Sequence, residues 1–153
     1  MSERVIDELL VLRTVFDFTA SFDNVDLDGM LSRFAPDGCW HRQAGDVNGH
    51  DGVRKLMAER PPGLFGRHIL TNSRVDFTSQ DEARCASYLM VFRLDLPDKP
   101  QGFPIEFDGR PRLVGQCADR LVRLGGQWKL AERRATIELQ RHSRPAGEGE
   151  PFR

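Results

Sequence analysis

Four long β-rich segments dominate the second half of the chain. They are rich in Val, Ile, Leu, Thr and aromatic residues and cover 67–78, 83–95, 112–124 and 127–140. Asp81-Glu82 separates the first two and Gly125-Gly126 the last two, and such short polar or glycine-containing connections suit hairpins. Strands joined in this way pair antiparallel, so this half of the chain is predicted to form most of a sheet.

The first half has helical periodicity instead. Apolar residues recur at helical spacing from Val5 to Phe22, which predicts a long amphipathic helix. The residues that define this spacing are Val5, Leu9, Leu12 and Phe16, with Ile6 and Leu10 beside them. A short second helix is predicted to follow Asp26, which is placed to cap it, and to end before Pro36.

A strand over 38–43 and a third short helix, ended by Pro61 and Pro62, complete the pattern. Helices followed by consecutive strands indicate the α+β class, and we expect a single domain over residues 1–141. The proline-rich stretch 97–111 is long for a connection and suggests a lid or a subunit contact. Residues 142–153 have little apolar content, which predicts a flexible C-terminal tail.

Charge and hydropathy argue against several classes of partner. Lys and Arg number 22 against 23 Asp and Glu, the formal net charge is −1, and no long basic run is present. Nucleic acid and anionic membrane surfaces are therefore not expected partners. No apolar run reaches the ~18 residues of a membrane span, and acidic residues interrupt the N-terminal apolar stretch. These features predict a cytoplasmic protein.

Metal and cofactor motifs are absent from the sequence. The histidines form neither H-x-H nor H-E-x-x-H, and the glycines form neither a P-loop nor a G-x-G-x-x-G turn. The cysteines Cys39, Cys85 and Cys117 lie far apart in apolar or strand-like contexts and are interpreted as small buried thiols. The sequence predicts no zinc or iron site and no cofactor.

The order of the predicted elements, together with "FDNVDLDGMLSRFAPDGCW", "GHDGVRKLM", "RHILTN" and "DRLVRLGGQWKLAERRA", resembles the nuclear transport factor 2-like superfamily. The resemblance is to its SnoaL-like branch, which includes scytalone dehydratase, a hexachlorocyclohexane dehydrochlorinase and a bile acid dehydratase. Ring-hydroxylating dioxygenase small subunits share the fold. This resemblance implies a cone-shaped, curved and mostly antiparallel sheet wrapped around the long N-terminal helix and the two shorter ones.

The resemblance also implies a catalytic constellation. Asp23 and His68 match by position a pocket aspartate and a strand histidine of the lyase members, and Arg133 matches an arginine of the last strand. Arg134 is the alternative if the strand register is shifted by one residue. Asp119 is a possible ion-pair partner that would give Arg133 a structural role instead.

Further residues are candidates for substrate binding, although core packing is the commoner role of aromatic residues in such a sheet. The candidates are Trp40, Phe65, Asn72, Tyr88 and Phe92. Asn72 is placed on the face of His68 by the alternation of a strand, and Tyr88 is the only tyrosine of the chain. His41 follows Trp40 and is expected on the opposite face.

Two functions are compatible with these residues. The first is a cofactor-independent lyase or isomerase of dehydratase type, in which a His/Asp dyad abstracts a proton from a small apolar, aromatic or polycyclic substrate. The alternative is a non-catalytic small-molecule-binding or assembly module, such as a protein similar to a dioxygenase small subunit. Apolar residues on both faces of the strand 83–95 favour a homo-dimer or homo-trimer in either case.

Overall fold

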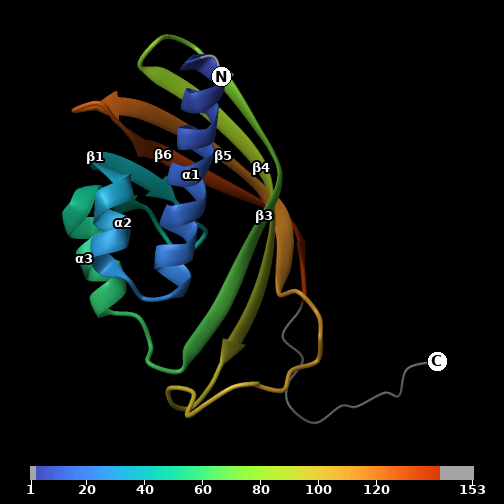
Figure 1. The fold of residues 1–153 in the computed structure, drawn as a ribbon. Helices are drawn as coiled ribbons and strands as arrows, with labels where there is room; N and C mark the ends of the chain where they lie inside the picture. The colour runs from blue at the N-terminus through green and yellow to red at the C-terminus, as the bar shows by residue number, and fades with distance from the viewer. Residues whose placement is uncertain (1–2, 142–153) are drawn as a thin grey trace.

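The computed structural model describes residues 3–141 and confirms the predicted α+β class (Figure 1). In this range the helices are α1 (Glu3–Asp23), α2 (Leu27–Arg33) and α3 (Gly49–Ala58). The strands are β1 (Phe34–His41), β2 (Val47–Asn48), β3 (Leu64–Phe77), β4 (Glu82–Asp95), β5 (Leu113–Leu124) and β6 (Gln127–Gln140). The tail predicted over 142–153 lies outside the described residues.

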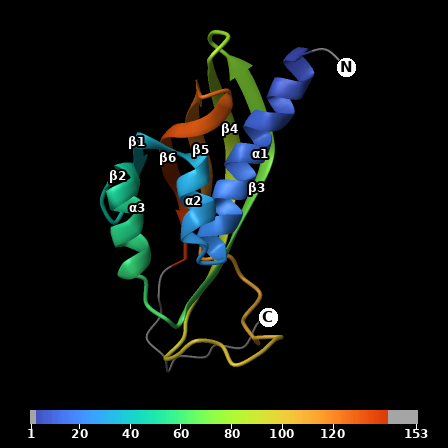
Figure 2. The same cartoon turned by 60° about the vertical axis from the view of Figure 1, so that its left-hand side comes forward.

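The strands form one curved, open sheet in the order β2-β1-β6-β5-β4-β3. The strands from β3 to β6 are joined as consecutive antiparallel pairs, as their hairpin connections require. Only the β1–β6 pair is parallel among the described strands, and its register sets Trp40 beside Arg133. The sheet bends around α1, with α2 and α3 covering its β1 end (Figures 1 and 2), so the predicted cone-shaped fold is confirmed.

Helix α1 buries a different face from the one predicted. Val11, Val15 and Phe18 are fully buried, whereas Leu9 is 54% exposed and Phe16 is 40% exposed. The predicted helix is confirmed, but α1 carries apolar residues on most of its circumference, so periodicity alone does not select the face that the sheet covers. Phe18 packs on Phe34 and Trp40, whose ring centroids lie 5.4 and 5.6 Å away.

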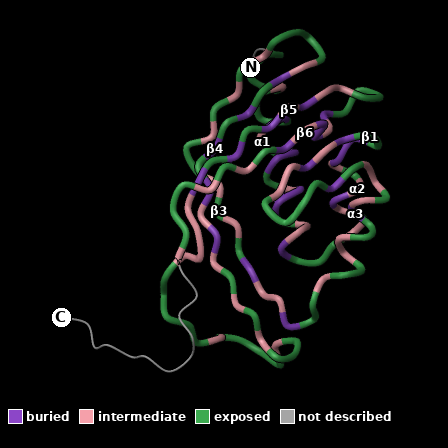
Figure 3. Tube along the Cα trace, turned by 180° about the vertical axis from the view of Figure 1, so that it is seen from behind, coloured by how far each residue is buried: buried purple, intermediate pink, exposed green. Residues whose placement is uncertain are grey.

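Residues of β4 alternate between an inward and an outward face. Leu89 and Val91 point into the fold, whereas Met90 and Phe92 point outward. Along the Cα trace, buried and exposed positions alternate in the central strands, while the segment between β4 and β5 is mostly exposed (Figure 3). The inward face of β4 therefore belongs to the core and the outward face to the surface.

A bulge in β3 overturns the placement of Asn72. The β3–β4 register shifts between Thr71 and Arg74, and Asn72 has a positive φ of 53°. Beyond the bulge the inward positions are odd-numbered, beginning with Ser73, and Asn72 is exposed. Asn72 therefore does not continue the face of His68, because the extra residue reverses the alternation.

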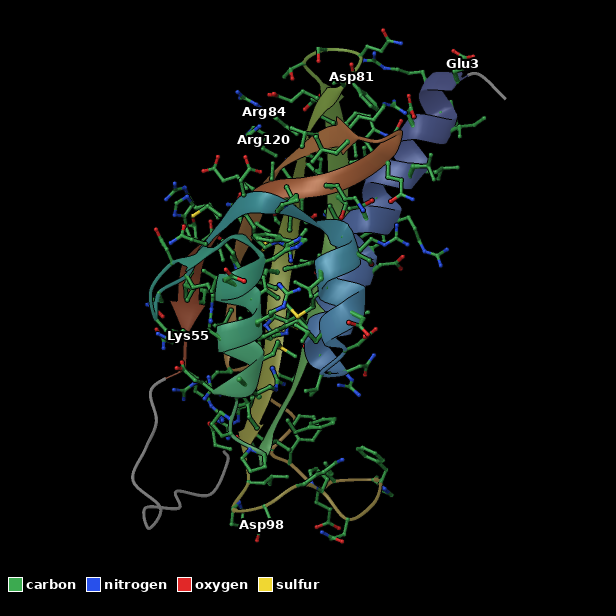
Figure 4. The ribbon with its side chains drawn as sticks, turned by 90° about the vertical axis from the view of Figure 1, so that its left-hand side faces the viewer. Glu3, Lys55, Asp81, Arg84, Asp98 and Arg120 are labelled. Carbon is green, nitrogen blue, oxygen red and sulfur yellow. The ribbon has the colours of Figure 1, made fainter. Side chains whose placement is uncertain are left out.

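The segment between β4 and β5 contacts the outward side of the sheet. Phe103 lies 5.7 Å from Phe65 and Phe107 lies 5.9 Å from Phe92, measured between ring centroids. The segment extends beyond the end of the sheet, and Asp98 lies near its start (Figure 4). Both Phe103 and Phe107 remain more than half exposed, at 73% and 52%. The predicted aromatic residues Phe65 and Phe92 thus belong to this outward contact.

Within residues 3–141, no helix is long and apolar enough to cross a membrane.

The burial of α1 predicts unequal effects of two phenylalanine substitutions on the same helix. Phe18→Ala should lower the free energy of unfolding by about 3–5 kcal/mol, because a fully buried ring leaves a cavity. Phe16→Ala, the matched control on the partly exposed side, should lower it by less than about 1.5 kcal/mol. Urea denaturation followed by circular dichroism measures both, and equal losses would contradict the observed orientation of α1.

Candidate functional site

A cavity of about 260 Å³ lies between α1 and the inward face of the sheet. Its apolar lining includes Phe22, Trp40, Leu70, Leu89, Val91 and Leu113. Its basic lining comprises His68, Arg42, Arg60, Arg93, Arg112 and Arg133. The cavity is therefore apolar in its walls but carries several cations, which the sequence analysis did not anticipate.

Asp23 and His68 form a dyad at one side of this cavity. Asp23 is the last residue of α1 and is 9% exposed, while His68 is the fifth residue of β3. The Oδ1 atom of Asp23 lies 2.6 Å from Nδ1 of His68, and its Oδ2 atom accepts a 2.7 Å hydrogen bond from the backbone N–H of His68. Both carboxylate oxygens thus hold the same residue, which fixes the backbone and the ring together.

This geometry defines the tautomer of His68. A carboxylate accepts hydrogen bonds, so Nδ1 carries the hydrogen and Nε2 is left with a free lone pair when the ring is neutral. The ring also packs edge-on against Phe22, with centroids 5.4 Å apart and an interplanar angle of 68°. Because His68 lines the cavity, Nε2 can act as a general base toward a bound molecule.

The neighbouring acid Asp26 has the capping role that the sequence predicts. Its Oδ1 atom accepts a 2.9 Å hydrogen bond from the backbone N–H of Gly29, at the N-terminus of α2. Asp26 thereby starts the second helix directly after the turn that follows Asp23. In "DNVDLD", Asp23 thus belongs to the dyad, Asp26 caps α2, and Asp28 lies in the first turn of that helix.

Arg133 rather than Arg134 faces the interior. Its Nε and Nη2 donate to the two carboxylate oxygens of Asp119, both at 2.8 Å, and its Nη1 donates to Oγ1 of Thr19 at 2.9 Å. Arg134 is exposed. Through these hydrogen bonds Arg133 joins β6 to β5 and α1. The sequence allowed either this structural role or charge stabilisation for Arg133.

Electrostatics keeps the Arg133 guanidinium charged. Burial lowers the pKa of Arg133, but the adjoining Asp119 carboxylate raises it more, so the pKa lies above its ordinary value. The bidentate contact also satisfies the charged oxygens of Asp119, whose side chain is fully buried. The pair therefore places a neutral ion pair, rather than a free cation, in the cavity wall.

Of the predicted substrate-binding residues, the structure brings only Trp40 to the cavity lining. Tyr88 is 47% exposed on the outward face of β4, and Asn72 is exposed at the bulge of β3. Phe65 and Phe92 contact the segment between β4 and β5, as described above. Strand alternation places Tyr88, Phe65 and Phe92 on the opposite face from Leu89 and His68, and the bulge in β3 turns Asn72 away from that face.

The charged lining residues that sequence reasoning missed are all arginines. Arg93 shares the alternation of Leu89 and Val91, so strand periodicity could have placed it. Arg42 and Arg60 follow β1 and α3 in connecting segments, where no periodic signal indicates a direction. Their convergence depends on how the chain folds around the cavity.

One cluster of possible metal ligands occurs among residues 3–141. It comprises Cys39, His41 and Asp46, whose ligand atoms all lie within 4.8 Å of one another, on the side of β1 opposite Trp40. The ring nitrogens of His41 also contact two carboxylates, Nδ1 that of Asp46 at 3.0 Å and Nε2 that of Glu132 at 3.2 Å. Burial raises the pKa of the Cys39 thiol, and the nearby carboxylates of Asp46 and Glu132 raise it further.

The two other cysteines are inert. Burial raises the pKa values of Cys85 and Cys117 to about 11, so both are thiols at neutral pH. Both are buried, as predicted, and no disulfide joins the described cysteines. Cys117 therefore contributes a small apolar surface to the cavity rather than a nucleophile.

Comparison with known families and structures identifies the fold family. The SnoaL-like domain matches residues 3–134. The chain belongs to this family. The resemblance of the sequence to the SnoaL-like branch is thereby confirmed, and the Asp23–His68 dyad lies within the matched region. A comparison with curated proteins finds no match.

Solved structures with the same fold share little sequence with this chain. A hexachlorocyclohexane dehydrochlorinase from Novosphingobium barchaimii LL02 has a TM-score of 0.72 at 15% identity, over 97% of each chain. A protein of unknown function from Mycobacterium tuberculosis has a TM-score of 0.70 at 20% identity, over 87% of this chain and 77% of that one. A cystatin-like protein of unknown function from Nostoc punctiforme has a TM-score of 0.66 at 22% identity, over 87% and 92%. At these identities the likeness shows the fold alone.

The buried ion pair predicts a large cost for removing one partner. Arg133→Met should lower the free energy of unfolding by about 3–5 kcal/mol, because it leaves the Asp119 carboxylate buried without a counter-charge. The double variant Arg133→Met/Asp119→Leu removes both charges and should recover most of that loss. Thermal unfolding followed by circular dichroism measures both variants, and a double variant less stable than the single one would contradict this account.

Proposed function

We propose that this SnoaL-like protein is a cofactor-independent lyase or isomerase in which His68 is the general base. The observation that carries the proposal is the 2.6 Å contact between Asp23 and Nδ1 of His68 beside a cavity with apolar walls. Family membership supports lyase chemistry in general, and one structural neighbour is named a dehydrochlorinase, an enzyme of elimination. The substrate and the exact reaction belong to the proposal.

The proposed reaction begins with proton transfer. Nε2 of His68 takes a proton from a carbon next to a carbonyl or a leaving group, and Asp23 stabilises the imidazolium that forms. In one outcome, the electron pair left on carbon expels a hydroxide, which the imidazolium protonates to water. In the other, the electron pair shifts to another carbon, which the imidazolium protonates. The first outcome is dehydration and the second is double-bond migration.

Arg133 has a supporting role in this scheme. Three of its donor contacts go to Asp119 and Thr19, which hold the guanidinium in the cavity wall. An arginine has five N–H donors, so donors remain that can face a developing oxyanion. Its primary role in the proposal is to fix α1 against the sheet, and stabilisation of charge is secondary.

Proton abstraction can be tested without knowing the natural substrate. A panel of cyclic ketones and β-hydroxy ketones, incubated with the protein in D₂O, should reveal exchange at the α-carbon or loss of water, followed by NMR. His68→Ala should lower the rate on any active compound by about 10²–10⁴-fold, because the base is gone. Asp23→Asn should also lower the rate, because an amide cannot stabilise the imidazolium as a carboxylate does.

The matched control is His41→Ala. His41 lies on β1 in contact with Asp46 and Glu132 and is not part of the cavity lining. It should retain the rate of the unmodified protein. Turnover that survives His68→Ala would refute the dyad as the catalytic base and favour the alternative of a non-catalytic binding or assembly module.

The outward face of the sheet favours a second copy of the chain as a partner. Ile69, Met90, Val114 and Leu139 lie in register across the strands from β3 to β6, forming one apolar row. Ile69 is 46% exposed and Leu139 is 66% exposed. An apolar row that crosses four strands is a surface suited to burial by another protein surface, so we propose a homo-dimer or homo-trimer through this face.

This assembly predicts a measurable change in mass. The protein should sediment as a dimer or trimer at micromolar concentration, and Leu139→Glu should shift it toward monomer by burying a charge at the interface. Leu124→Glu is the control, since Leu124 is 42% exposed at the end of β5 and lies outside the apolar row. A monomer at all concentrations up to tens of micromolar would refute the assembly.

A further inference from the structure

Three arginines from separate parts of the chain converge on the cavity. Arg42 directly follows β1, Arg60 follows α3, and Arg93 lies on the inward face of β4. Each of these positions is distant from the others in sequence, so the cluster is a product of the fold. The cavity lining contains no aspartate or glutamate within residues 3–141.

Two of these arginines have no carboxylate partner. Arg93 pairs with Asp95 at 2.7 Å, but neither Arg42 nor Arg60 has an acidic oxygen within 4.0 Å among the described residues. Their guanidinium groups lie instead over aromatic rings, Arg42 over Trp40 at 5.1 Å and Arg60 over Phe22 at 4.8 Å. Cation–π contacts of this kind hold the groups in place but leave the positive charge uncompensated.

The arginines also repel one another. Burial lowers the pKa of Arg42, and the nearby charges of Arg93 and Arg60 lower it further. Burial likewise lowers the pKa of Arg60, against an opposing effect of Asp23, and Arg93 adds to the lowering. A guanidinium remains charged at neutral pH under such shifts, so the cluster stores unfavourable like-charge interaction that an anion would relieve.

Two residues of the cavity lining carry unpaired donors. Among the described side chains, Nε of Arg60 and Nε1 of Trp40 are both buried without a hydrogen-bond acceptor. Trp40 is only 7% exposed and lines the cavity. Buried donors in folded proteins are normally paired, and each unpaired one costs free energy. Acceptor oxygens of a bound molecule would satisfy these donors.

We propose that the ligand of this cavity is an organic acid, an apolar ring system bearing a carboxylate that Arg42 and Arg60 bind. The inference rests on the proposed function in taking the cavity as the substrate site, and it replaces the expectation of a wholly apolar substrate. Phe22 contacts both the Arg60 guanidinium and the His68 ring. A ring system that packs along Phe22 would therefore place its carboxylate at Arg42 and Arg60 and its carbon framework next to His68.

Binding measurements with matched acids and amides test the charge requirement. The probes are benzoate, cyclohexanecarboxylate and 2-naphthoate, each compared with its neutral primary amide of nearly equal shape. Isothermal titration calorimetry at low ionic strength gives the affinity of each. At least one acid should bind more than tenfold tighter than its amide, because only the acid meets the guanidinium groups with a charge. Equal affinities within every pair, or no binding of any acid at millimolar concentration, would overturn the proposal.

Substitutions test whether Arg42 and Arg60 cause the preference for the acid over the amide. Arg42→Gln, Arg60→Gln and the double variant should reduce the preference for the acid, the double variant to less than about threefold. Arg84→Gln is the matched control, since Arg84 is exposed on β4 and lies away from the cavity lining (Figure 4). A full preference retained in the double variant would also overturn the proposal. Unchanged binding of the amide shows that each variant is folded.

These outcomes are separable from those for the proposed reaction. Binding of the acids does not require His68 to accept a proton, so His68→Ala should keep the acid preference while it loses turnover. If the acid preference is preserved and turnover does not change in His68→Ala, the dyad is refuted as the base and the anion site is supported. Turnover dependent on His68 with no acid preference would refute the anion site alone.

Discussion

The ion pair between Arg133 and Asp119 is the contact on which the arrangement of the site depends. The Arg133 guanidinium on β6 donates hydrogen bonds to Asp119 on β5 and to Thr19 on α1. These bonds fix the position of α1 along the sheet that bends around it. Asp23 lies one helical turn after Thr19 and on the same side of α1. The position of α1 along the sheet thus determines where the Asp23 carboxylate contacts β3. That contact in turn sets the orientation of the His68 ring.

Two kinds of charged group lie in and beside the cavity. Asp23 balances His68 when the ring is protonated, and Asp119 balances Arg133, so these groups form compensated pairs. Arg42 and Arg60 have no carboxylate oxygen within 4.0 Å in the described chain, although the charge of Asp23 reaches Arg60. A base works best where its conjugate acid is stabilised, whereas recognition of an anion requires positive charge that is not already paired, and the lining residues supply both.

Local patterns predicted much of this architecture. Hairpin connections and β-rich segments gave the order of strands β3 to β6, and Asp26 was identified as a helix cap from its place before an apolar run. The dyad followed from position within a family pattern. On α1, apolar residues lie on most sides of the helix, so periodicity did not show that Val11 and Phe18 are on the buried face. At Asn72, a bulge reversed the alternation of the strand. Tyr88, Phe65 and Phe92 were misplaced because aromatic character does not indicate which face of a strand a residue occupies.

The sequence by itself determined the α+β class, the order of the elements, and the residue types available for acid–base chemistry. Periodicity, caps and turns are properties of a few neighbouring residues, so they can be recognised without knowledge of the fold. Only the tertiary structure decided which side of α1 is covered, that Arg133 pairs with Asp119, and that Arg42 and Arg60 converge on one cavity. Those outcomes depend on contacts between segments far apart in the chain, where side-chain direction is fixed by strand register and by the packing of α1.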